Sequence, residues 1–129
     1  MKSNFTRKHT SLPEILLDKG LAKVGDAFVN FVFSLAVSNK KATPTNIRVP
    51  SSIMSEALRK TGYRKYLPRR VDRHGQGDAV EALIFYSWLE EILSLEECVS
   101  ILQQEADIPV EAFANLITII IERWDTIND

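Results

Sequence analysis

Two acidic residues in the second half of the chain are spaced so that their side chains could bind one metal ion. Asp78 and Glu81 lie three residues apart in segment 77–84, where a strongly apolar helical pattern begins. Residues at i and i+3 are neighbours on a helix, so both carboxylates should share a face. A hard divalent cation such as Mg²⁺, which binds carboxylate oxygens and keeps several waters, would relieve their mutual repulsion. The alternative is that both acids only complement the positive end of the helix dipole.

A third acid, Asp26, stands near the start of the most apolar helix that the sequence predicts, over residues 21–38. It belongs to the short segment Gly25-Asp26-Ala27. Apolar residues occur on nearly every face of this helix, and such a helix is normally buried on all sides. It therefore forms either the core of the monomer or the contact between two copies of the chain.

These motifs together resemble the endonuclease domain of ribonuclease III, a family that cleaves double-stranded RNA. The resemblance consists of G-D-A in one helix, D-A-V-E-A-L-I about fifty residues later, and G-Y-R-K-Y-L at 62–67, and it covers roughly residues 12–105. It implies that Asp26, Asp78 and Glu81 are the catalytic residues and the metal ligands. The family has a further Glu four residues before the first Asp, where this chain has Ala22. That pattern, and a short chain without an appended RNA-binding domain, are similar to the mini-ribonuclease III branch.

The resemblance implies an all-α, ribonuclease III endonuclease-like domain of about six helices that forms a homodimer. Its reaction would be hydrolysis of phosphodiester bonds in double-stranded or structured RNA, with Mg²⁺ or alternatively Mn²⁺ as cofactor. A second interpretation is a non-catalytic dimer of the same fold that binds structured RNA or a ribonucleoprotein, and Ala22 favours it. A third is a helical interaction module whose acids are ordinary surface residues.

The charge distribution indicates a nucleic-acid contact. The net charge is −1, but residues 40–73 contain ten basic residues against two acidic ones, and twelve acids follow from His74 onward with one arginine. Such asymmetry favours contact with a polyanion, although a solvated basic loop would look the same. We expect a mobile basic loop at 63–77, with His74 as an exposed histidine without a catalytic role. The residues predicted to bind RNA are Arg64, Lys65, Arg69, Arg70 and Arg73.

Length and composition indicate a single domain. At 129 residues and 45% hydrophobic content the chain can bury a core, and we expect a flexible terminus at 1–10 before a domain at 11–129. The chain has one cysteine, Cys98, at an apolar helical position, so no internal disulfide can form. It has no C-x-x-C pair and no Gly-rich phosphate loop. No secretory signal is visible, and the apolar runs at 27–37 and 112–121 are shorter than a membrane span, so we expect a cytoplasmic protein.

Helix signals divide the rest of the chain. Ser11 should cap a first helix that ends at Gly20, Ser51 or Ser52 should cap a helix that stops at Gly62, and Ser94 opens a capping box. No segment alternates convincingly with the period of a strand. The helices that we expect cover residues 12–19, 21–38, 51–60, 64–67, 78–93, 94–105 and 110 to the C-terminus.

Overall fold

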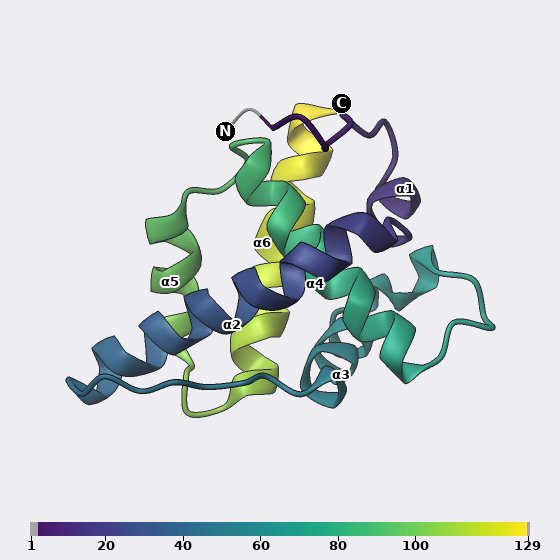
Figure 1. Cartoon of the computed structure of the whole chain (residues 1–129). Coiled ribbons are helices and arrows are strands. Elements are labelled where there is room, and N and C mark those ends of the chain that lie inside the picture. Colours follow the sequence, from purple (N-terminus) through teal and green to yellow (C-terminus); the bar gives the residue numbers. More distant parts are fainter. Residues whose placement is uncertain (1–2, 129) are drawn as a thin grey trace.

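A computed structural model describes residues 3–128, and this part of the chain is helical and contains no strand (Figure 1). The expectation of an all-α fold with about six helices is confirmed. The elements are α1 (Leu12–Leu16), α2 (Lys19–Lys41), α3 (Ser51–Thr61), the short 3₁₀ helix η1 (Tyr63–Tyr66), α4 (Arg73–Leu89), α5 (Leu95–Gln104) and α6 (Pro109–Ile127).

Helix α4 is the centre of the fold. It packs against α1, α2, α3 and α6, and every residue from 79 to 87 is buried. A helix that is apolar on all sides must be surrounded by other elements to be stable in water. Figure 1 shows α2 crossing α4, and this crossing has the most extensive packing in the domain. Both segments that carry the predicted catalytic acids therefore meet at the best-packed part of the molecule.

The structure differs from the expected helix boundaries at two places that matter for the site. Helix α2 begins at Lys19 with Asp18 as its N-cap, so Gly20 lies inside this helix and does not end the previous one. Helix α4 begins at Arg73, five residues before Asp78, and ends at Leu89. The predicted mobile loop at 63–77 is therefore η1, a short connection and the first turn of α4.

The predicted caps were partly wrong. Pro50 is the N-cap of α3 and makes no side-chain cap, so neither Ser51 nor Ser52 has that role. Gly62 does end α3 in the left-handed conformation, at φ 82°. The capping box at Ser94 is also confirmed, with hydrogen bonds between Ser94 and Glu97 in both directions. The predicted caps were therefore right at Gly62 and Ser94 and wrong at Ser51 and Ser52.

Residues 3–10, predicted to be a flexible terminus, make contacts with the helical core. The His9 backbone N–H donates to Tyr86 Oη at 2.9 Å, and His9 Nε2 lies 2.9 Å from Asp18 Oδ2. The Phe5 ring stacks on Phe85 at 6.3 Å. Met1 and Lys2 lie outside the described residues. The described part of the terminus thus joins the start of α2 to the middle of α4.

Cys98 is a free thiol of α5 inside the core. Its side chain is fully buried, and this burial is the main cause that raises the pKa of the thiol to about 12. Cys98 is therefore neutral and shielded in the folded protein, in agreement with its predicted place in the core.

Helix α2 has the length and composition of a helix that could cross a membrane, and it is the one such helix among residues 3–128. Core helices of soluble proteins have the same properties. Here α2 packs against α4 and α5. We therefore describe it as a core helix.

Candidate active site

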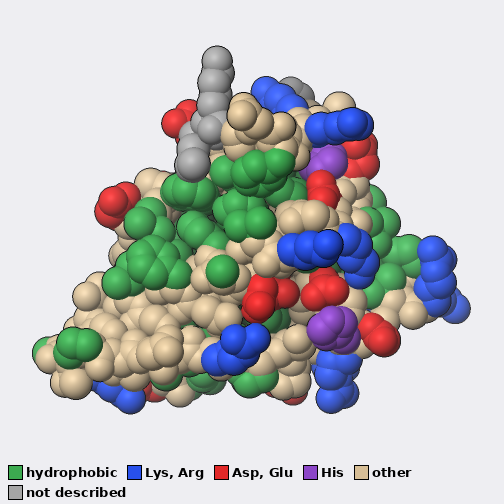
Figure 2. All heavy atoms as spheres, viewed as in Figure 1, with side chains coloured by type: hydrophobic (Ala, Val, Ile, Leu, Met, Phe, Trp, Pro, Cys, Tyr) green, Lys and Arg blue, Asp and Glu red, His purple; other side chains and the backbone are tan. Residues whose placement is uncertain are grey.

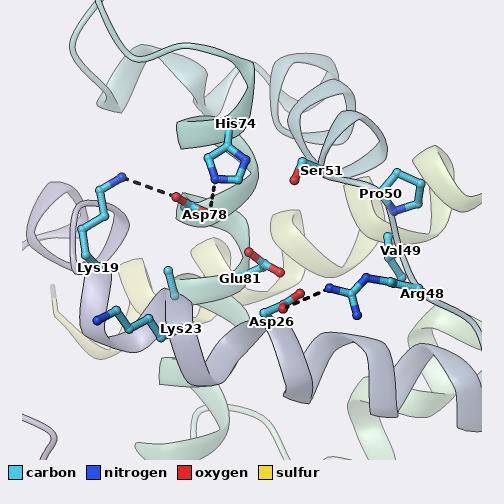
Figure 3. Close-up of a pocket in the computed structure, with 11 residues that line it drawn as sticks. Lys19, Lys23, Asp26, Arg48, Val49, Pro50, Ser51, His74, Asp78 and Glu81 are labelled. Atoms are coloured by element: carbon cyan, nitrogen blue, oxygen red, sulfur yellow. Dashed lines mark hydrogen bonds and ion pairs between the residues drawn. The ribbon is translucent and has the colours of Figure 1, made fainter.

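A cavity of about 730 Å³ opens where α2, α4 and the segment before α3 meet (Figure 3). Its walls carry three acids, three basic residues and a histidine. The residues that line it are Lys19, Ala22, Lys23, Asp26, Arg48, Val49, Pro50, Ser51, His74, Asp78 and Glu81.

The structure places all three predicted catalytic acids in this cavity. Asp26 comes from α2, and Asp78 and Glu81 come from α4. The alternative that Asp78 and Glu81 complement a helix dipole is wrong, because α4 already begins at Arg73 and the dipole effect falls off within the first turn. Among residues 3–128, Glu81 is the only buried acidic or basic residue, with 5% of its surface exposed.

Two glycines allow the cavity walls to approach closely. Gly25 of α2 lies directly against the backbone of Glu81, and a side chain there would meet the carbonyl group of Glu81. Gly77 of α4 lies against Ser51 at the start of α3, where an added Cβ would be 3.0 Å from the Ser51 Cβ. Glycine, which has no Cβ, is suited to such close approach of backbones. The three elements that carry the cavity therefore pack at short range.

The pKa of the Glu81 carboxyl group is strongly raised by its surroundings. Burial, hydrogen bonding with Asp26 and the negative charges of Asp26 and Asp78 raise the pKa of Glu81 to about 8, opposed by the positive charge of Arg48. Burial disfavours the ionised form of a carboxyl group, and nearby like charges do the same. Near neutral pH, Glu81 is thus mostly protonated unless a cation joins the three acids.

Each of the two more exposed acids is paired with a basic side chain. Lys19 Nζ lies 3.5 Å from Asp78 Oδ2, and His74 Nε2 lies 3.7 Å from Asp78 Oδ1. On the other side of the cavity, Arg48 Nη2 lies 3.9 Å from Asp26 Oδ2. Figure 3 shows these pairs as dashed lines on opposite sides of Glu81.

Sequence reasoning did not assign Lys19, Arg48 or His74 to the site. Lys19 had a usable signal, because its spacing of seven residues from Asp26 puts both on one face of a helix. His74 was expected in a loop, but it lies in the first turn of α4, one turn before Asp78. Arg48 lies in the irregular loop at 42–50, and its distance to Asp26 depends on how that loop folds back.

Asn30 fixes that loop. Its side-chain Nδ2 donates to Asp26 Oδ1 at 3.3 Å, while its Oδ1 accepts the backbone N–H of Val49 at 2.7 Å. One amide therefore orients the Asp26 carboxylate and anchors the residue next to Arg48. Sequence reasoning also missed Asn30, which lies one helical turn after Asp26.

A family model described as Ribonuclease III matches residues 19–125. The chain belongs to the ribonuclease III family. The match begins where α2 begins and ends within α6, so it includes every residue of the cavity. No curated protein sequence shows significant similarity to the chain. Family membership supports a nuclease role in RNA processing. In this chain Asp26, Asp78 and Glu81 line one cavity.

The three acids of the cavity have oxygen atoms that suit a divalent cation, but they are not arranged as one set of three ligands. Within residues 3–128, no three His, Cys, Asp or Glu side chains are arranged to hold one ion together. Asp78 is paired with Lys19 and His74 and Asp26 with Arg48, but only Asp26 forms a hydrogen bond with Glu81. Mg²⁺ commonly binds through one or two carboxylates and several waters. Asp26 and Glu81 are therefore the side chains best placed to hold such an ion.

The five residues predicted to bind RNA fall into two groups. Arg64 is occupied within the protein, because its Nη1 and Nη2 atoms donate to the carbonyl oxygens of Leu67, Pro68, Arg69 and Val71 at 3.0–3.1 Å. The other four are exposed and lie in the segment from η1 to the first turn of α4. They are Lys65, Arg69, Arg70 and Arg73. Arg64 therefore shapes the segment that presents the other basic residues.

Proposed function

We propose that the chain is a metal-dependent endoribonuclease that hydrolyses phosphodiester bonds in double-stranded or structured RNA. The observation that carries this proposal is the meeting of Asp26, Asp78 and Glu81, from two different helices, in one cavity bordered by basic side chains. Hydrolysis of a phosphodiester builds negative charge on the phosphate. A cation held by the three acids, together with the basic side chains, can stabilise that charge.

Asp26 and Glu81 would hold the divalent cation, Mg²⁺ or alternatively Mn²⁺, with Asp78 bound directly or through water. When bound, the ion supplies a water of lowered pKa and neutralises charge on the phosphate. The protein must first release the proton of Glu81, whose pKa is raised to about 8 by burial and by the neighbouring acids. Cation binding and ionisation of Glu81 are therefore coupled.

The RNA would lie across the cavity and the exposed basic residues of the segment from η1 to the first turn of α4. Lys65, Arg69, Arg70 and Arg73 offer contacts to phosphates, with Arg64 as the residue that orders their segment. Side chains cannot read the deep major groove of an RNA duplex, so recognition would depend on A-form shape, phosphates and 2′-hydroxyls. Such a surface selects structured RNA over a particular sequence.

We propose that two copies of the chain associate through an apolar face on α2. Val24 is 46% and Phe31 is 52% exposed, which is unusual for large apolar side chains on a core helix. Phe28 lies between them and stacks on Trp88 at 5.1 Å. Figure 2 shows apolar side chains gathered next to the acidic ones on one side of the molecule. A symmetric dimer, the commonest closed arrangement, would cover this face.

The proposed activity is tested by cleavage of a generic RNA duplex in Mg²⁺ and in EDTA. Wild-type protein should cut only with the divalent ion, and Glu81→Gln should lose most of this activity. Glu105→Gln, which removes an exposed acid at the end of α5, is the matched control and should cut like wild type. Equal cleavage by wild type and Glu81→Gln would reject the site.

A non-catalytic role in RNA binding is the second candidate. It is favoured by Ala22, which lines the cavity where the ribonuclease III pattern has a carboxylate. Duplex binding without cleavage in either Mg²⁺ or Mn²⁺ would support this role.

A further inference from the structure

The cavity holds as many basic residues as acidic ones. Three basic residues, Lys19, Lys23 and Arg48, line it together with the three carboxylic acids. A divalent cation bound to the acids would leave the cavity with excess positive charge. An anionic ligand with two or more charges would restore the balance, and successive phosphates of an RNA strand carry such charges.

Lys19 and Arg48 are arranged to change partners. They approach the acids from opposite sides of the cavity, one from the first turn of α2 and the other from the segment before α3 (Figure 3). Their side chains are 68% and 84% exposed, and their distances to Asp78 and Asp26 are 3.5 and 3.9 Å. Exposed ion pairs with such geometry contribute little stability. A phosphate that reaches the cavity can therefore displace the acids from both cations at low cost.

We propose that Lys19 and Arg48 form a phosphate clamp across the mouth of the cavity. They hold Asp78 and Asp26 in the unliganded protein and transfer to phosphate oxygens of the RNA strand when it binds. The inference rests on the proposed function and adds two RNA-binding residues to it. Arg48 offers a planar set of N–H donors that suits two phosphate oxygens, whereas Lys19 offers a compact charge.

Lys23 provides a matched comparison within the same cavity. It lies one helical turn after Lys19 on α2 and carries the same charge, but it forms no ion pair among the described residues. A general effect of positive potential would make Lys19 and Lys23 equally important for RNA affinity. A clamp at the positions of the acids makes Lys19 more important than Lys23.

The test measures binding of a short RNA duplex by fluorescence anisotropy in EDTA, where no cleavage occurs. Lys19→Gln and Arg48→Gln should each weaken binding about tenfold at low salt. Each should also reduce the slope of log affinity against log salt by about one, the loss expected for one phosphate contact. Lys23→Gln should weaken binding much less. Losses of equal size for Lys19→Gln and Lys23→Gln would overturn the clamp.

A second comparison separates a phosphate contact from simple neutralisation of Asp78. If Lys19 only neutralised that acid, Lys19→Gln would have no effect on binding in an Asp78→Asn background. The clamp requires that Lys19→Gln still weakens binding about tenfold in that background. Disappearance of the effect would overturn the proposal.

The two proposals fail in different experiments. Weaker binding of Lys19→Gln and Arg48→Gln in EDTA supports the clamp even if the protein never cuts RNA. Unchanged binding by both variants, together with normal Mg²⁺-dependent cleavage by wild type, overturns the clamp and leaves the proposed enzyme in place.

Discussion

A Cβ atom on Gly25 would lie 2.4 Å from the backbone carbonyl oxygen of Glu81. Atoms that are not bonded do not approach so closely, so the two helix backbones touch at this point only because residue 25 has no side chain. The contact lies next to Asp26 on α2. It therefore sets the distance between the helices that carry the acids.

Gly25→Ala should destabilise the protein by about 3 kcal/mol, because α2 and α4 must separate to admit the methyl group. Gly20→Ala is the matched control in the same helix. There the nearest atom is Asp18 Oδ1 at 3.3 Å, the cap oxygen that accepts the Leu21 N–H, so a methyl group needs a shift of only a few tenths of an ångström and stability should change by about 1 kcal/mol or less. Urea denaturation measures both variants. Equal effects would show that the helices do not meet as closely as described.

Glu81→Gln should stabilise the protein in EDTA, and the gain should depend on pH. The folded-state pKa of Glu81 is raised from an ordinary 4.5 to about 8, so the folded protein holds a proton that the unfolded chain releases. The stability of wild type should therefore fall as pH rises from about 4.5 to about 8. Glu81→Gln does not lose stability in this way, so its free energy of unfolding at pH 8 should exceed that of wild type by on the order of a few kcal/mol.

Thermal melts of both proteins at pH 4.5 and pH 8 measure this difference. The two should unfold at similar temperatures at the lower pH, and Glu81→Gln should unfold at the higher temperature at pH 8. Addition of Mg²⁺ at pH 8 should stabilise wild type much more than Glu81→Gln, since a ligand of the folded state raises stability. Identical responses to pH and Mg²⁺ would contradict both the buried carboxyl and the cation site.

Arg64→Lys should loosen the segment between η1 and α4 although the charge is kept. Lysine cannot reproduce the planar donors that contact four carbonyl oxygens, so several hydrogen bonds of about 1 kcal/mol each would be lost. Hydrogen exchange at residues 67–71 should become faster. Arg69→Lys, an exposed neighbour, should leave exchange unchanged. If Arg64→Lys also left it unchanged, Arg64 would not organise this segment.

Phe31→Lys should convert the proposed dimer into a monomer, because a charge within an apolar contact is costly to bury. Sedimentation velocity at micromolar concentration distinguishes the two states. Ile108→Lys is the control, since Ile108 has a similar exposure of 53% but lies before α6, next to Asp107, which pairs with Lys40 nine residues further along α2 than Phe31. A wild-type protein that sediments as a monomer would exclude association through α2.

The sequence was sufficient to predict that Asp78 and Glu81 share a helix face and that Asp26 belongs with them. Helical spacing and the ribonuclease III pattern both point to these acids. The start of α4 was misplaced because Gly75 and Gly77 normally favour turns. In the structure Asp72 caps the helix by accepting the Gly75 N–H at 2.9 Å, and Gly77 allows the contact with Ser51.

The basic partners of the acids could not be derived in the same way. Lys19 and Asp78 are 59 residues apart, and their distance depends on where α2 crosses α4. Arg48 reaches Asp26 because Asn30 holds the backbone of the intervening loop. Both pairs arise from tertiary packing between distant segments. Helical spacing in the sequence predicts only which residues of one helix share a face, so it could not reveal these pairs.

The burial of Cys98 makes the chain suitable for site-specific labelling. With its thiol inside the core and its pKa raised to about 12, Cys98 should not react with maleimides or spin-label reagents in the folded protein. A single cysteine introduced at an exposed position such as Lys65 would then carry the one label on each chain. Any distance measured between two spin labels would come from a second copy of the molecule, so it would report the geometry of association directly.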